Sequence, residues 1–206
     1  MSFKIKIFIA LSVSILLLTF TLMKSTPMTT VEVDDYLAQI SGFTHIPGGQ
    51  HDLNELKEFF STDDGESFYT VNLYKYHDKA QYLTPESSGI SGIEAYNKFS
   101  SVMMKLLFSN FSYPVFGSNW LDLSDNGWDR IVIVKYRSRR DMAKIFSNPE
   151  FSKASEHKWA SIQKHDRFIV KAVHLPEIYL LFALIVIILF TILLTRKKRT
   201  LKIKTV

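Results

Sequence analysis

Asn72 is the first candidate for chemistry, because it is an amide inside the apolar and aromatic stretch 68–76 (FYTVNLYKY). Burying an amide costs free energy unless its donors and acceptor find partners. In a strand, side chains alternate between two faces, so Thr70, Asn72 and Tyr74 share one face. The Asn72 amide can therefore orient a carbonyl or enolate oxygen of a bound molecule, or it can hydrogen-bond a neighbouring loop.

His157 is the candidate for acid–base chemistry, since imidazole titrates near neutral pH. It lies in a segment that we expect to be helical, where it can act as a general base, ligate haem iron, or simply pack on the surface of the helix. The chain has 6 histidines and no cysteine. No histidine pair has the i, i+4 metal spacing with a carboxylate beside it, so we predict neither a metal centre nor a bound cofactor.

Aromatic residues from separate segments complete a predicted apolar pocket beside Asn72. Packing between a sheet and helices explains such rings equally well. The residues predicted to line this pocket are Asn72, Tyr74, Tyr96, Trp120 and Tyr136.

The basic cluster Arg137, Arg139 and Arg140 can receive a carboxylate ligand, although a solvated helix face is the favoured interpretation. The sequence has no nucleophile elbow with Ser-His-Asp order, no phosphate-binding loop, no glycine-rich dinucleotide turn and no HExxH. These absences leave open whether the chain is an enzyme.

Hydrophobic periodicity predicts the elements that must position these residues. The expected strands are 68–76, 113–121, 130–136 and 168–174, and the expected helices are 33–40, 52–60, one that begins at Ser91 or Gly92, 139–147 and 149–164. The main domain is then β-α-β-β-α-β, an α+β ferredoxin-like fold with helices on one sheet face only. We expect a homodimer in which two sheets cover each other face to face.

Several motifs resemble those of a known bacterial family. They include 71–76 (VNLYKY), 91–96 (SGIEAY), 148–151 (NPEF) and the pair His157-Lys158. The domain resembles the domain of unknown function 1330 group, within the dimeric α/β-barrel superfamily, over roughly residues 67–173. Arg137 and Lys158 depart from the pattern, where relatives usually have Pro and Arg.

The resemblance implies a fold rather than a reaction. The superfamily contains cofactor-free monooxygenases, lactone isomerases, haem-degrading and chlorite-decomposing enzymes, and members without a known reaction. Fold alone does not license an activity. Three hypotheses about function follow. The chain is a module that binds a small apolar ligand or a protein, or it is a cofactor-free enzyme that acts on a small aromatic or lactone-like substrate, with Asn72 orienting the substrate and His157 as the acid–base group. The third hypothesis is a haem-handling protein with His157 as the iron ligand.

Two uncharged apolar segments, 7–23 and 178–195, frame the domain and predict transmembrane helices. A cleavable signal peptide is the alternative for the first. Basic residues flank both segments on their outer sides, which predicts that both termini are cytoplasmic and that the central domain lies outside the cell membrane of a bacterium. Residues 24–177 hold 17 basic and all 20 acidic residues, so nucleic acid is not an expected partner.

The predicted organisation therefore has five parts. They are an N-terminal anchor at 1–23, a juxtamembrane linker with short helices at 24–66, the ferredoxin-like domain at 67–176, a transmembrane helix at 177–195 and a basic tail at 196–206. The predicted partners are the lipid bilayer, a second copy of the chain and a small apolar ligand.

Overall fold

The computed structural model describes residues 8, 10–14, 25–43, 52–83, 89–119, 127–172 and 175–203, and the side chains of the last segment over 178–193. The chain divides into two compact units. One comprises residues 24–171, and the other comprises residues 1–23 together with 172–206.

The larger unit contains a four-stranded sheet in the order β2-β3-β1-β4. The strands are β1 (Phe68–Tyr76), β2 (Tyr113–Asn119), β3 (Arg130–Tyr136) and β4 (Ile162–Val170). All three strand pairings are antiparallel. Helix α4 (Gly92–Ser109) connects β1 to β2, and helices α5 (Arg139–Phe146) and α6 (Pro149–Ser161) connect β3 to β4. This order and connectivity confirm the predicted α+β ferredoxin-like fold.

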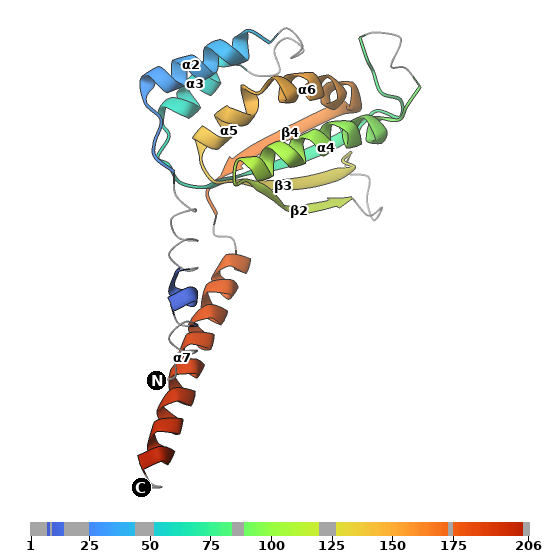
Figure 1. Cartoon of the computed structure of the whole chain (residues 1–206). Helices are drawn as coiled ribbons and strands as arrows, with labels where there is room; N and C mark the ends of the chain where they lie inside the picture. Colours follow the sequence, from blue (N-terminus) through green and yellow to red (C-terminus); the bar gives the residue numbers. More distant parts are fainter. Residues whose placement is uncertain are drawn as a thin grey trace. The chain divides into compact units, whose positions relative to one another are not determined.

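Capping residues fix where the helices that cover the sheet begin. Ser91 caps α4, and Glu94 closes a capping box with it. Ser138 caps α5 and Asn148 caps α6, which carries Pro149 in its first turn. Such caps satisfy the orphan backbone N–H groups of the first turn. Figure 1 shows α4, α5 and α6 on one face of the sheet.

The prediction for the last strand was wrong at its start. The helix expected to run to residue 164 ends at Ser161, and β4 begins at Ile162 instead of 168. Residues 162–167 (IQKHDR) are mostly polar, which hid the strand, yet His165 and Arg167 are half-buried between exposed neighbours. β4 lies at the edge of the sheet, and an edge strand can expose polar side chains to water on one of its faces.

Residues 25–66 belong to the same compact unit as the sheet, which differs from the predicted linker. They form α2 (Thr30–Ser41) and α3 (Leu53–Ser61). Val33 of α2 and Phe60 of α3 are buried in the same hydrophobic cluster as Phe68 of β1 and Ile145 of α5. Figure 1 shows α2 and α3 beside α5.

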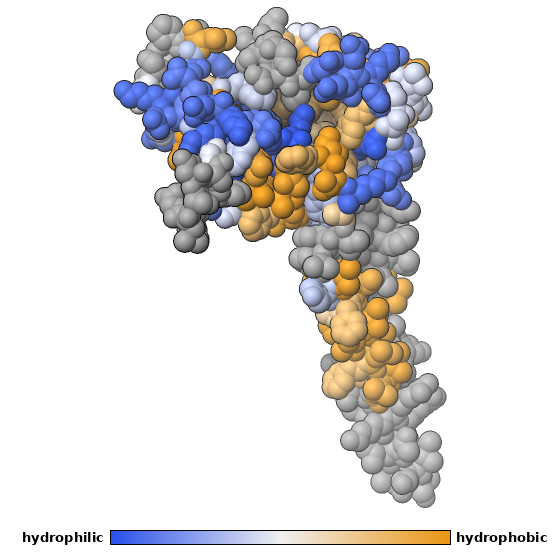
Figure 2. All heavy atoms as spheres, turned by 180° about the vertical axis from the view of Figure 1, so that it is seen from behind, coloured by the Kyte–Doolittle hydropathy of each residue, from blue (hydrophilic) through white to orange (hydrophobic). Residues whose placement is uncertain are grey.

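The sheet face opposite the helices carries no helix of the described residues and is largely apolar. By strand alternation it presents half-buried side chains of β1 and β3 and exposed ones of β4. They are Val71, Leu73, Ile131, Ile133, Phe168 and Val170. Seen from behind, the unit shows apolar side chains gathered between hydrophilic ones (Figure 2).

The smaller unit contains α7 (Leu175–Ile203). Large apolar side chains along the described part of α7 are exposed, among them Leu180, Phe182 and Phe190. Figure 2 shows them as an apolar run. Among the residues that the structure describes, no helix combines the length and hydropathy needed to cross a membrane. The first apolar segment lies mostly outside the described residues, and membrane anchoring stays a prediction from the sequence.

Candidate functional site

A cavity of about 90 Å³ lies between the sheet and helices α4, α5 and α6. Its wall combines aromatic and aliphatic side chains with a few polar groups, as is typical of small-molecule sites. The apolar part of the wall includes Phe99, Met103, Leu107, Met142, Phe146 and Phe151. The polar part includes Thr70, Asn72, Tyr74, Tyr96, Tyr136, Lys158 and Arg167.

Asn72 lies on the sheet side of this cavity and is 6% exposed. Its Nδ2 donates to the hydroxyl of Thr70 at 3.1 Å and to the carbonyl oxygen of Val132 at 3.2 Å. Its Oδ1 lies 3.3 Å from Nε2 of His165, which must donate because the amide oxygen can only accept. The amide is thus held rigidly by its own sheet while facing the cavity.

Three predicted pocket tyrosines, Tyr74, Tyr96 and Tyr136, also line the cavity. Tyr74 and Tyr96 pack with ring centroids 5.0 Å apart and are hydrogen-bonded through their side chains. Burial raises the pKa of all three phenols. All three therefore stay protonated at neutral pH, and the proton of Tyr74 is donated to the hydroxyl of Tyr96.

Lys158 is the site residue whose importance the sequence did not reveal. It lines the cavity from α6, is only 7% exposed, and its Nζ lies 5.7 Å from the ring centroid of Phe99 and 4.5 Å from that of Trp159. Burial lowers the pKa of Lys158 to about 7, and the positive charge of Arg167 lowers it as well. The amine therefore changes its charge near neutral pH.

Helical periodicity could have drawn attention to this lysine. Phe151, Ala154, Ser155 and Lys158 follow the i, i+3, i+4, i+7 spacing of a buried stripe, and all four are buried. A lysine on such a stripe is rare unless it has a function or a partner.

Arg167 brings a second cation to the cavity from β4, where it pairs in register with Asn72 of β1. His165, two residues earlier on the same face, stacks on the ring of Tyr74 at a centroid distance of 4.9 Å. Both residues were missed because the strand was predicted to begin only at 168. Strand alternation applied from Ile162 onward would have placed them beside Asn72.

His157 does not belong to the described wall of the cavity. It lies on α6, and its Nδ1 is 2.8 Å from the hydroxyl of Tyr82. Burial lowers the pKa of His157, and the charge of Lys98 lowers it as well, so the ring is neutral at pH 7. The structure thus places the predicted acid–base group beside Tyr82 and puts its neighbour Lys158 into the cavity.

Trp120, the fifth residue predicted to line the pocket, and several other aromatic and histidine side chains are not part of the described site. Trp120, His45 and His51 lie outside the described residues. Trp128 is not part of the described cavity wall, and the Nζ of Lys164 lies 3.9 Å from its ring centroid. Within the described part of the chain, no three potential metal-ligating side chains gather into a cluster.

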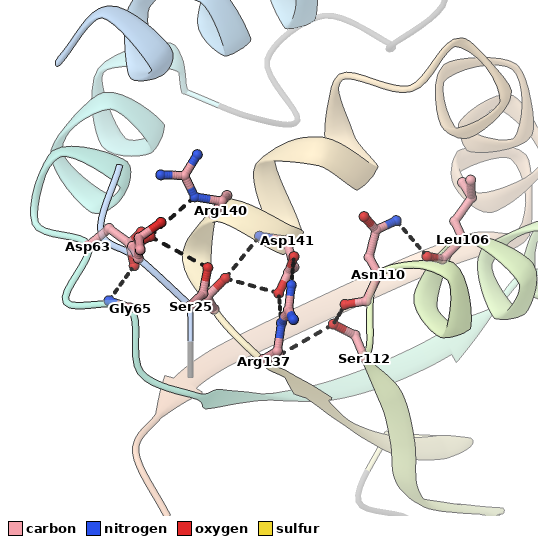
Figure 3. Close-up of polar contacts among 11 residues, drawn as sticks. Ser25, Asp63, Gly65, Leu106, Asn110, Ser112, Arg137, Arg140 and Asp141 are labelled. Atoms are coloured by element: carbon pink, nitrogen blue, oxygen red, sulfur yellow. Dashed lines mark hydrogen bonds and ion pairs between the residues drawn. The ribbon is translucent and has the colours of Figure 1, made fainter. Parts of the chain in front are cut away.

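The arginine cluster after β3 is not the solvated face that the sequence favoured. Arg137 binds both carboxylate oxygens of the buried Asp141, at 2.7 and 2.9 Å, as Figure 3 shows. Ser138 Oγ donates to the same carboxylate at 3.0 Å. The pair ties the start of α5 to the end of β3.

The other two arginines fasten α2 and α3 to α5. Arg139 donates to the carbonyl oxygen of Phe59 at 2.7 Å and lies over its ring. Arg140 forms an ion pair with Glu32 and donates to the carbonyl oxygen of Pro27 at 3.0 Å. These partners lie about 80 to 110 residues away in the sequence, which is why the cluster appeared free to bind a ligand.

Comparisons with known proteins identify a fold but no family. No family model matches the chain, and no curated protein matches it. The chain is similar to the crystal structure of the methylated RPA0582 protein, at 20% identity and a TM-score of 0.54, over 64% of this chain and 97% of that one. The RPA0582 protein of unknown function from Rhodopseudomonas palustris, a structural genomics target, matches at 20% identity and a TM-score of 0.53, over 63% and 98%.

A third match is a dimeric protein of unknown function and ferredoxin-like fold from Bacteroides fragilis NCTC 9343. It is 11% identical, with a TM-score of 0.36, over 52% of this chain and 96% of that one. The two RPA0582 structures show that the fold of this domain has been seen before in a protein of unknown function.

Proposed function

We propose that this chain is a small-molecule-binding protein whose ligand occupies the cavity between the sheet and helices α4, α5 and α6. The observation that carries the proposal is the wall of that cavity. It combines apolar rings with the rigidly held Asn72 amide and two cations, Lys158 and Arg167. Burying a lysine without a counter-charge costs free energy, and a bound anion would offset that cost.

We also propose that the protein forms a homodimer, in which the sheet face opposite the helices in one copy packs against the same face of the other copy. Val71, Ile133 and Phe168 are examples of the apolar side chains that water would otherwise contact on this face. Burying apolar surface stabilises association by about 25 cal/mol per Å² before the costs of ordering. The resemblance to the dimeric α/β-barrel superfamily supports the same arrangement.

We further propose that the protein is anchored in a bacterial cell membrane with its larger unit outside the cytoplasm. The support is the uncharged segments 7–23 and 178–195 and the basic run Arg196–Arg199 that follows the second. The apolar side chains exposed along α7 are of the kind that lipid would cover.

Cofactor-free catalysis in the same cavity is the second candidate function. The observation that favours it is Lys158, because an amine with a pKa of about 7 can exchange protons at neutral pH. Lys158 thereby takes the acid–base role that the sequence suggested for His157. Haem handling has no such support, since a cavity of about 90 Å³ is smaller than the range typical of drug-sized ligands.

Native mass spectrometry of the full chain, released from a mild detergent, tests ligand binding. We expect the wild-type protein to carry an additional small-molecule mass. Ser100→Phe fills the cavity, because Ser100 is part of its wall, and should remove that mass. Ser101→Phe is the matched control: Ser101 is exposed, and both hydroxyls donate to the carbonyl oxygen three residues earlier.

Two results would contradict the proposal. One is an additional mass that Ser100→Phe leaves unchanged, which would place the bound molecule elsewhere. The other is a wild-type protein that carries no additional mass and acquires none when incubated with mixtures of small organic acids, amides and alcohols.

A further inference from the structure

We infer that the ligand of this cavity is a short-chain organic carboxylate, with its charged end between Lys158 and Arg167 and its apolar end against the aromatic and methionine side chains. The inference rests on the proposed binding function and names the chemical class of the ligand. It follows from the charges, hydrogen bonds and size of the cavity.

The charges of the cavity are unbalanced. Lys158 enters from α6 and Arg167 from β4, and the described wall contains neither Asp nor Glu. Among the residues that the structure describes, neither cation forms an ion pair, although five other cations do. Removing a cation from water without a counter-charge is costly, so an anion that enters the cavity gains both charges as partners.

Hydrogen bonding in the cavity is suited to an acceptor. A carboxylate has only acceptor oxygens, and the guanidinium of Arg167 matches its planar geometry. The hydroxyl of Tyr136 stays protonated because burial raises its pKa, so it is a further donor on the wall. The Nδ2 of Asn72 is already occupied by Thr70 and Val132, which makes Asn72 a positioning residue for the sheet wall.

The apolar remainder of the wall distinguishes a carboxylate from an inorganic anion. Phe99, Met142 and Phe146 give no hydrogen bonds to the outer oxygens of a phosphate, whereas they cover an alkyl group. The volume of about 90 Å³ is smaller than the cavity of about 150 Å³ that accommodates benzene. Both features favour a short alkyl carboxylate.

Three of the 6 methionines can report on binding in the cavity through the signals of their methyl groups. Met103, Met104 and Met142 line the cavity, whereas Met28 packs against the hydrophobic core and is not part of the described wall. The full chain in detergent, labelled with ¹³C at the methionine methyl groups, is titrated at pH 6.5 with propionate and separately with propionamide. The two probes have nearly the same shape and differ in charge.

We expect propionate to shift the three cavity methyl signals, to leave Met28 in place, and to bind about tenfold or more tightly than propionamide. Lys158→Gln keeps a polar side chain without the charge and should reduce that preference by about tenfold. The matched control is Lys153→Gln on the exposed side of the same helix, which should keep it.

Equal binding of the two probes at the cavity methyl groups would overturn the carboxylate inference while leaving the proposed binding function intact. Preference for propionate that survives in Lys158→Gln would overturn the role of Lys158. If neither probe shifts the cavity methyl signals, the inference also fails, and the mass measurement with Ser100→Phe then decides the binding function independently.

Discussion

Replacing Lys158 by methionine should stabilise the fold, and the gain should depend on pH. Lys158 is 7% exposed between the rings of Phe99 and Trp159 and has no ion-pair partner among the described residues. Methionine has a similar length and no charge, so Lys158→Met removes the cost of burying the ammonium group with little change in volume.

The magnitude follows from the two pKa values. The amine titrates at about 7 in the fold and at 10.5 when exposed, a difference that corresponds to about 5 kcal/mol. Between these values the unfolded chain binds more protons than the folded one. The free energy of unfolding of the wild type therefore rises with pH by about 1.4 kcal/mol per pH unit in that window.

The stability advantage of Lys158→Met should accordingly be largest at pH 7 and below, and it should shrink by about 2 kcal/mol between pH 7 and pH 9. Urea denaturation of the full chain in detergent, without added anion, measures it through tryptophan fluorescence. Lys153→Met, on the exposed side of α6, is the control and should show no such dependence. A stability difference between wild type and Lys158→Met that is the same at both pH values would refute the reasoning.

Three further predictions concern the dimer, the α5 ion pair and the topology. Val71→Glu, on the sheet face opposite the helices, should convert the dimer to a monomer, as measured by light scattering. Val31→Glu, on the exposed side of α2, is the control and should remain a dimer. If both variants remain dimers, the face-to-face arrangement is contradicted. Asp141→Asn leaves the partly buried Arg137 without its counter-charge and should lower the free energy of unfolding by about 2 to 4 kcal/mol, as measured by chemical denaturation. Asp78→Asn, at an exposed position, is the control. Equal losses of stability in the two variants would show that the ion pair contributes nothing. Because the chain has no cysteine, a membrane-impermeant maleimide applied to intact cells should label Asp78→Cys and not Lys204→Cys, and the reverse pattern would invert the proposed topology.

The sequence predicted best the elements whose signals are local. β1 and β3 have the predicted bounds, because continuous apolar and β-branched residues mark central strands. The start of α4 is set by Ser91 and Glu94 within four residues of one another. The start of β4 was missed because an edge strand keeps polar side chains, so its sequence lacks that apolar signal.

The candidate site was predictable on the sheet and less so on the helices. Asn72 and the three tyrosines share faces that strand and helix periodicity place toward each other, and they line the same cavity. Lys158 was missed because a cation is assumed to face water unless the opposite wall is known, and Arg167 was missed because the start of β4 was not recognised. The role of Arg139 and Arg140 was hidden for the same reason as that of Lys158, since their partners are supplied by α3 and α2.

Intermolecular nuclear Overhauser effects between bound propionate and the methionine methyl groups test the central claim, that a short-chain carboxylate occupies the cavity between the sheet and helices α4 to α6. The account predicts contacts from the propionate protons to the methyl groups of Met103, Met104 and Met142, and none to that of Met28. Contacts confined to Met28, or none to any cavity methionine at saturating propionate, would contradict it.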